Sequence, residues 1–157
     1  MTTSSDGKIA LLRHTVATLA YRGGKALRGA PAGFAGYGSR TPGQILAHVC
    51  DLFDWALTIT DGKEAWHNSQ PQSWDADIAR FFALLEAFDH RLASGVPLSA
   101  APELLFQGPV ADALTHIGQI AMLRRMAGCP VSGENYFVAK IETGRVGASQ
   151  AAPANEF

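Results

Sequence analysis

Residues 109–128, with the sequence PVADALTHIGQIAMLRRMAG, decide the fold that the chain is expected to adopt. Pro109 suits the first turn of a helix, where its missing N–H would have no intrahelical partner. Gly128 is followed at once by Cys129 and Pro130, which is typical of a helix end. The stretch therefore predicts one long helix that begins at Pro109 and ends near Gly128.

The apolar residues of this stretch recur at helical spacing and predict a broad buried face. They are Val110, Ala113, Leu114, Ile117, Ile120, Ala121 and Leu123. Asp112, His116 and Gln119 lie on the same helix, and at about 100° per residue they project within an arc of roughly 60°. A carboxylate, an imidazole and an amide beside an apolar face are costly unless something satisfies them. These three side chains are therefore candidate functional residues.

Length and composition predict one globular domain. The 157 residues are 47% apolar and 17% charged, a balance that argues against global disorder. The formal net charge of -1 supplies no overall attraction for nucleic acid, so no nucleic-acid partner is expected. The chain has no apolar run of about 18 residues and no signal-peptide pattern, so we expect a cytoplasmic protein without a membrane span. Cys50 and Cys129 form no CxxC pair and are expected to be small buried or half-buried residues.

Two helices are predicted in the first sixty residues. The first runs from about residue 6 to about residue 28, and the Gly23-Gly24 pair is expected to weaken or kink its end. The second begins at Thr41 and runs to about residue 60, because Thr41-Pro42-Gly43-Gln44 is a capping box with proline at the first helical position.

A third helix is predicted from Ser73, its N-cap, to about residue 93. The segments 61–73 and 94–108, on either side of it, break the helical periodicity and are predicted to be loops. With the helix that follows Pro109, the chain has four helices, which favours an all-α bundle with antiparallel or cross-connected helices.

The end of the chain departs from this pattern. Residues 134–142 predict a short extra helix or an extended segment, and residues 143–157 predict a tail with little to bury. The expected organisation is therefore a flexible N-terminus over residues 1–6, a helical domain over residues 7–142 and a C-terminal tail over residues 143–157.

A metal site is the chemistry that the polar residues favour most. If the second helix faces the fourth, His48 can converge with Asp112 and His116. Two imidazoles and one carboxylate leave coordination positions open for water and substrate. This ligand set suits Zn²⁺, Ni²⁺, Fe²⁺ or Mn²⁺, and the spacing does not choose among them.

Further residues are candidates to support this site or to line a pocket beside it: Gln119, Asp51, Trp66, His67 and Tyr37. A purely structural interpretation stays open for all of them. His48 can be a satisfied core histidine, and an Asp/His pair four residues apart can be an ion pair or a polar seam.

Two segments, TPGQILAHVCDLFDWAL (41–57) and ADALTHIGQIAMLRRMAGCPV (111–131), resemble the DinB/YfiT-like superfamily, and the resemblance extends over about residues 7–142. It implies a four-helix bundle with a metal held by three ligands, usually histidines. His48 matches the ligand on the second helix, and His116 matches the second member of an H-x-x-x-H pair. Asp112 stands at the first position of that pair. Either it is a ligand itself, or the metal is weaker, different or absent.

The resemblance also implies a function. Characterised branches of the superfamily are metal-dependent transferases and isomerases that use low-molecular-weight thiols such as bacillithiol and mycothiol. We therefore expect a thiol-dependent S-transferase, or a related hydrolase, that acts on a small electrophilic substrate and forms a homodimer. The alternative is a non-catalytic metal-binding or dimeric interaction protein of the same fold.

Overall fold

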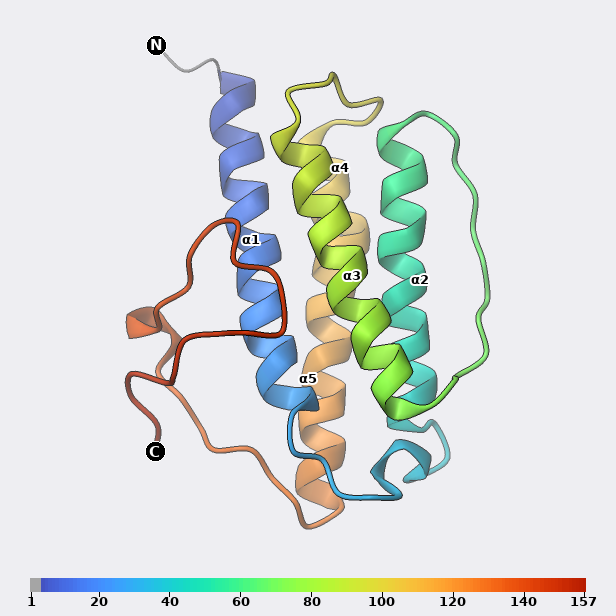
Figure 1. Cartoon of the computed structure of the whole chain (residues 1–157), viewed down its shortest axis with the longest axis vertical. Coiled ribbons are helices and arrows are strands. Elements are labelled where there is room, and N and C mark those ends of the chain that lie inside the picture. The colour runs from blue at the N-terminus through green and yellow to red at the C-terminus, as the bar shows by residue number, and fades with distance from the viewer. Residues whose placement is uncertain (1–3) are drawn as a thin grey trace.

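Four long helices account for most of the chain in the computed structural model, which describes residues 4–157 (Figure 1). They are α1 (Ser4–Leu27), α2 (Pro42–Thr60), α3 (Trp74–Ala93) and α5 (Ala111–Met126), and a short helix, α4 (Pro102–Leu105), precedes α5. The described residues contain no strand, so the prediction of an all-α helical bundle is confirmed. Within residues 4–157, no helix combines the length and apolar character that a membrane span requires.

The bundle is cross-connected. In Figure 1, α1 and α5 run downwards, whereas α2 and α3 both run upwards. Because α2 and α3 are parallel, residues 61–73 must return along the whole length of the bundle between them, and Figure 1 shows this long connection at the outer side of α2. The packed pairs are α1 with α3 and α5, and α2 with α3 and α5. The seam between α2 and α5 is therefore built from antiparallel neighbours.

The starts of α2 and α3 follow the predicted caps. The Thr41 hydroxyl accepts a hydrogen bond from the Gln44 backbone N–H at 3.2 Å, and the Gln44 side chain accepts one from the Thr41 N–H at 3.0 Å. The Ser73 hydroxyl accepts from the Ala76 N–H at 3.1 Å. These bonds satisfy N–H groups that have no intrahelical partner, and they fix where each helix begins.

The predicted start of the last long helix is wrong. Helical structure begins earlier, at α4, and reaches α5 through a wider π-type turn, Phe106–Val110. Pro109 lies inside this turn and is buried, so it does not occupy a first helical turn. Its ring nitrogen cannot donate to the preceding turn, and the Ala111 N–H instead bonds back to the carbonyl of Phe106. The predicted end is confirmed, because Gly128 follows the helix with a φ of 78°.

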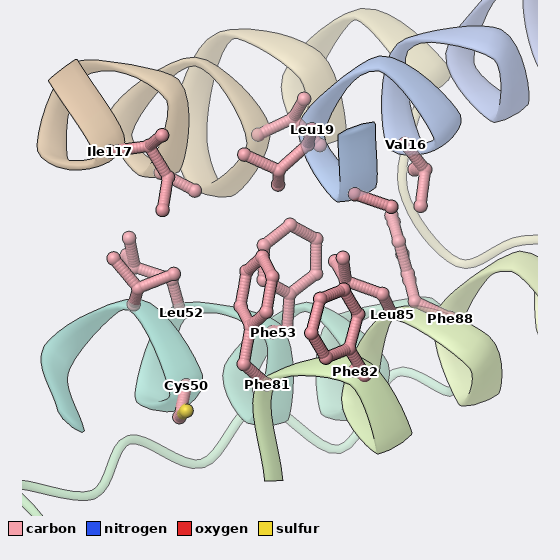
Figure 2. Packing of buried hydrophobic residues seen from close by; sticks show 14 of the residues in the cluster. Val16, Leu19, Cys50, Leu52, Phe53, Phe81, Phe82, Leu85, Phe88 and Ile117 are labelled. Carbon is pink, nitrogen blue, oxygen red and sulfur yellow. The ribbon is translucent and has the colours of Figure 1, made fainter. Parts of the chain in front are cut away.

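Aromatic residues of α2 and α3 fill the core. Figure 2 shows Phe53, Phe81 and Phe88 packed between these helices and the side chains of α1 and α5. The first helix continues past the glycine pair to Leu27, close to its predicted end near residue 28. Gly23 permits close packing, because a Cβ there would lie 2.7 Å from the Phe81 ring.

The predicted buried face of the last helix is confirmed in its central row. Val110, Ala113, Ile117 and Ile120 are buried. The flanking members, Leu114, Ala121 and Leu123, are half-buried against the core. Asp112 and His116 therefore lie beside a packed face, at the edge of the helix that faces α2.

At the ends of the chain, residues 4–6 and the segment after residue 143 differ from expectation, whereas residues 134–142 agree with it. Residues 4–6 belong to α1, and the rest of the predicted flexible N-terminus, residues 1–3, lies outside the described residues. Residues 134–142 contain a short 3₁₀ turn, Tyr136–Val138, within an otherwise extended segment. The segment after residue 143 buries more than predicted, because Val146 is only 5% exposed.

The C-terminal segment is tied to α1 by a cluster of charges. The Tyr21 hydroxyl donates to Glu134 at 2.5 Å, and the Lys25 ammonium lies 2.7 Å from Glu134 and 3.0 Å from Glu156. Burial of Tyr21 and its hydrogen bond to Glu134 raise the pKa of the Tyr21 phenol well above its ordinary value. The end of the chain is thus held by contacts with the last two turns of α1.

Candidate metal centre

The seam between α2 and α5 brings three of the predicted site residues together. His48 lies two turns into α2, on the edge of its buried face, and its side chain is 29% exposed. Asp112 and His116 lie one turn apart at the start of α5, where helical spacing stacks them on the same side. The packing of α2 against α5 then places the imidazole of His48 beside both.

Two imidazole nitrogens face one carboxylate. Nε2 of His48 lies 3.5 Å from Oδ2 of Asp112, and Nε2 of His116 lies 3.5 Å from Oδ1 of the same residue. The two imidazole rings meet edge to face, with centroids 4.8 Å apart. One ligand atom from each residue can be chosen so that all three lie within 4.8 Å of one another.

The two Nε2–carboxylate distances match shared coordination better than direct hydrogen bonding. An N–H···O bond is about 2.7–3.2 Å long, which is shorter than both Nε2–carboxylate distances. Adjacent ligand atoms on one cation, with bonds of about 2.0–2.2 Å, lie roughly 3.0–3.5 Å apart. Borderline nitrogen ligands with one hard oxygen form a donor set that divalent transition metals accept. The residues present therefore fit a metal ion.

Gln119 orients one of the two histidines. Nδ1 of His116 lies 2.7 Å from Oε1 of Gln119. An amide oxygen only accepts hydrogen bonds, so Nδ1 of His116 is the donor, and Nε2 of the neutral ring keeps its lone pair. That lone pair is on the nitrogen that faces Asp112. A hydrogen bond of this kind is the usual way in which a metal-binding histidine is fixed in its tautomer.

The centre opens to solvent on the side of Asp112. The Asp112 side chain is 47% exposed, whereas the His116 side chain is only 13% exposed. A cation held by three protein ligands would therefore keep coordination positions that water or a small molecule can reach. Catalytic metal sites have this open arrangement, whereas structural sites are closed by four protein ligands.

Trp66 covers His48 from the long connection between α2 and α3. The indole and the imidazole meet edge to face, with centroids 5.6 Å apart, and Trp55 also meets Trp66 edge to face, with centroids 5.8 Å apart. Trp66 thus lies directly beside His48. Trp55 was not among the predicted residues, although it lies seven residues after His48 and therefore on the same side of the predicted helix.

Asp51 does not join the three clustered residues. Its buried carboxylate accepts hydrogen bonds from the backbone N–H and hydroxyl of Ser69, both at 2.7 Å, and from Arg80 at 2.9 Å. Burial alone would raise the pKa of Asp51, but these hydrogen bonds and the Arg80 charge outweigh burial and hold the pKa below its ordinary value. Asp51 therefore anchors the connection that carries Trp66.

The other two candidates also lie apart from the cluster. His67 is exposed and pairs with Asp54, with its Nδ1 3.3 Å from the Asp54 carboxylate. Tyr37 is half-buried against the hydrophobic core in the segment before α2. The structure thus gives Tyr37 a packing role and places His67 beside the Asp54 carboxylate at the surface.

Comparison with known proteins adds no assignment: no protein-family model, curated protein or solved structure matches the chain significantly. The chemistry of the site must therefore be argued from its own geometry.

Proposed function

We propose that His48, Asp112 and His116 bind a divalent transition metal, and that the protein is a metal-dependent enzyme acting on a small electrophilic substrate. The observation that carries this proposal is the approach of two imidazole Nε2 atoms to one carboxylate at 3.5 Å each. Because Nδ1 of His116 donates to Gln119, the lone pair on its Nε2 would face a negatively charged oxygen without a cation or an added proton, which is unfavourable. Zn²⁺, Ni²⁺, Fe²⁺ and Mn²⁺ all suit such a ligand set.

The proposed reaction is transfer of a low-molecular-weight thiol to the electrophile, or a related hydrolysis. A divalent metal in this position would favour the deprotonated form of a bound thiol or water and would polarise a carbonyl. Three residues of the chain would support the metal in this chemistry. Gln119 holds His116 in the tautomer that binds, Asp112 contributes negative charge to the ligand set, and Trp66 shields His48 from water. We further propose a cytoplasmic location, where low-molecular-weight thiols are kept reduced.

Metal analysis tests the first part of this proposal. Untagged protein should contain about one transition-metal ion per chain, and the ion should be lost in His48→Ala and His116→Ala. Thiol consumption by the metal-loaded protein should then be screened with several electrophiles. His14→Ala is the matched control, because His14 is an exposed histidine on α1 and should not affect metal content. Folded, metal-free protein that does not bind added Zn²⁺ would contradict the proposal.

A second candidate function is that of a dimeric interaction protein. Leu11 and Phe106 are 67% and 47% exposed, and they line a groove of about 560 Å³ between α1 and α4. Apolar groups exposed together on a small protein favour a contact with another chain. We propose a second copy as that partner. Sedimentation analysis should show a dimer that Leu11→Lys converts to a monomer, and a monomeric wild-type protein would exclude this candidate.

A further inference from the structure

A groove adjoins the proposed metal centre along the α2–α5 seam. It has a volume of about 460 Å³, and its lining includes Arg40, Ile45, Gly118, Gln119, Met122 and Leu123. The volume falls in the range of small-molecule sites, which are mostly apolar with a few polar groups. The lining here has the same character, with three apolar side chains and three polar ones, the third of which is Thr115.

The groove extends from the metal centre towards the start of α2 and the end of α5. Ile45 lies one turn before His48 on α2, and Leu123 lies about two turns after His116 on α5. Because these helices are antiparallel neighbours, both positions lie on the same side of the centre. At 1.5 Å per residue, the far end of the groove is roughly 10 Å from the clustered ligands.

Gln119 belongs to both the groove and the metal centre. Its Oε1 atom accepts the hydrogen bond from His116, and its amide nitrogen is the group left to meet a ligand in the groove. Gly118 beside it keeps the groove open, because a Cβ at that position would have no atom within 4 Å. A glycine inside a helix costs about 1 kcal/mol relative to alanine, so helix stability does not explain it.

Among the residues that the structure describes, Arg40 provides the only charged side chain at the groove's lining. It is exposed, and it forms no hydrogen bond, ion pair or ring contact with any residue in the range 4–157. Most other arginines of the described chain are engaged: Arg13, Arg80 and Arg91 each bind a carboxylate. A free guanidinium at the end of an apolar groove is suited to a planar anion such as a carboxylate.

We infer that the groove binds an elongated organic acid, with its carboxylate at Arg40, its apolar middle over Ile45 and Met122, and its opposite end at Gln119 and the metal centre. This inference rests on the proposed function and extends it by naming the substrate class. The roughly 10 Å span corresponds to a carboxylate about six to eight bonds from the group that reaches the metal. The carboxylated partner can be the thiol itself or the electrophile.

Metal-free and zinc-loaded protein should be tested separately, so that the groove and the metal centre are judged independently. In ¹⁵N-labelled metal-free protein, hexanoate should shift the amide signals of Ile45, Gly118 and Gln119 in a saturable way. Hexanamide, which lacks the charge, should bind about five- to ten-fold more weakly. In zinc-loaded protein, 6-mercaptohexanoate should bind at least about ten-fold more tightly than hexanoate, because its two ends bind together.

Three variants give the decisive comparison. Arg40→Gln should weaken hexanoate binding about five- to ten-fold, and the matched control Arg125→Gln, at an exposed arginine of α5, should leave it unchanged. Gly118→Ala should weaken binding while keeping or raising the melting temperature, which excludes unfolding as the cause.

The two proposals fail in different ways. Equal binding of hexanoate by wild type and Arg40→Gln, or shifts confined to other surfaces, would overturn the inference while stoichiometric zinc binding still supported the metal centre. Hexanoate binding at the groove without any zinc binding would overturn the proposed function, and with it the assignment of the acid as substrate.

Discussion

Nδ1 of His116 lies 2.7 Å from Oε1 of Gln119, one turn further along α5. This contact directs the other ring nitrogen of His116 towards Asp112 and makes Gln119 part of the proposed centre. Gln119→Leu removes the acceptor and should lower the affinity for Zn²⁺ about 10- to 100-fold, measured by competition with a fluorescent chelator. Gln119→Glu keeps an acceptor and should keep most of the affinity. Gln107→Leu, at an exposed glutamine outside the centre, should have no effect.

Substitutions at Asp112 test whether its carboxylate is a metal ligand. Asp112→Ala removes a ligand and should reduce Zn²⁺ affinity at least about ten-fold, whereas Asp112→His replaces one ligand by another and should preserve binding. Asp75→Ala, at an exposed aspartate in the first turn of α3, is the control for loss of charge. Unchanged affinity in Asp112→Ala would show that the carboxylate is not a ligand. Isothermal titration calorimetry gives the comparison directly.

Trp66 should report metal binding by its fluorescence. Its ring lies 5.6 Å from that of His48, so a quenching ion such as Ni²⁺ at the centre would lie next to it. Stoichiometric Ni²⁺ should therefore reduce the intrinsic fluorescence, and Trp66→Phe should remove most of the change. Trp74→Phe should not, because Trp74 packs against Phe34 instead. Equal quenching in both variants would place the bound ion elsewhere.

The anchor of the long connection should make stability depend on pH. Hydrogen bonds from Ser69 and Arg80 hold the pKa of Asp51 below its ordinary value, so the folded state favours the ionised form. The stabilising contribution is complete above the ordinary pKa of about 4, and it is lost as the pH falls through the lower pKa of the folded state. Urea unfolding between pH 7 and pH 2.5 should show this loss in wild type and a smaller loss in Asp51→Asn. Asp75→Asn should behave like wild type.

Arg124 should be a strong determinant of stability. Its guanidinium donates to the carbonyls of Ala26, Arg28 and Gly29 at the end of α1, at 3.1, 2.6 and 3.3 Å. Arg124→Met would leave these carbonyls without that donor and should lower the free energy of unfolding by about 2–4 kcal/mol. Arg125→Met is the matched control and should change stability by less than about 0.5 kcal/mol, since Arg125 is exposed. Denaturant titration measures both.

Local rules predicted the parts of the fold that depend on neighbouring residues. The Thr41 and Ser73 caps set the starts of α2 and α3, because each cap bonds to a backbone group three residues away. Pro109 was misassigned because a proline suits a first helical turn and a π-type turn equally well in sequence. The packing around the buried Pro109 decides between the two kinds of turn, and that packing cannot be read from the neighbouring residues in the sequence.

The candidate centre, like the fold, was predictable from sequence only where its residues are close neighbours in the chain. Helical spacing alone places Asp112 beside His116, whereas the meeting of His48 with both depends on which helices are neighbours in space. The anchoring role of Asp51 could not be anticipated, because Ser69 and Arg80 reach it from 18 and 29 residues away. Arg124 likewise binds a helix end almost a hundred residues earlier in the chain.

Because α2 and α3 are parallel, the connection between them, residues 61–73, can be shortened only a little. The 19 residues of α2 rise roughly 28 Å, and the connection over residues 61–73 must cover about that distance. Thirteen residues reach at most about 45 Å when fully extended, so removal of five or more leaves almost no slack. Trimming here would pull the indole of Trp66 away from the imidazole it covers, and homologous chains that keep this topology should therefore tolerate insertions between α2 and α3 far better than deletions.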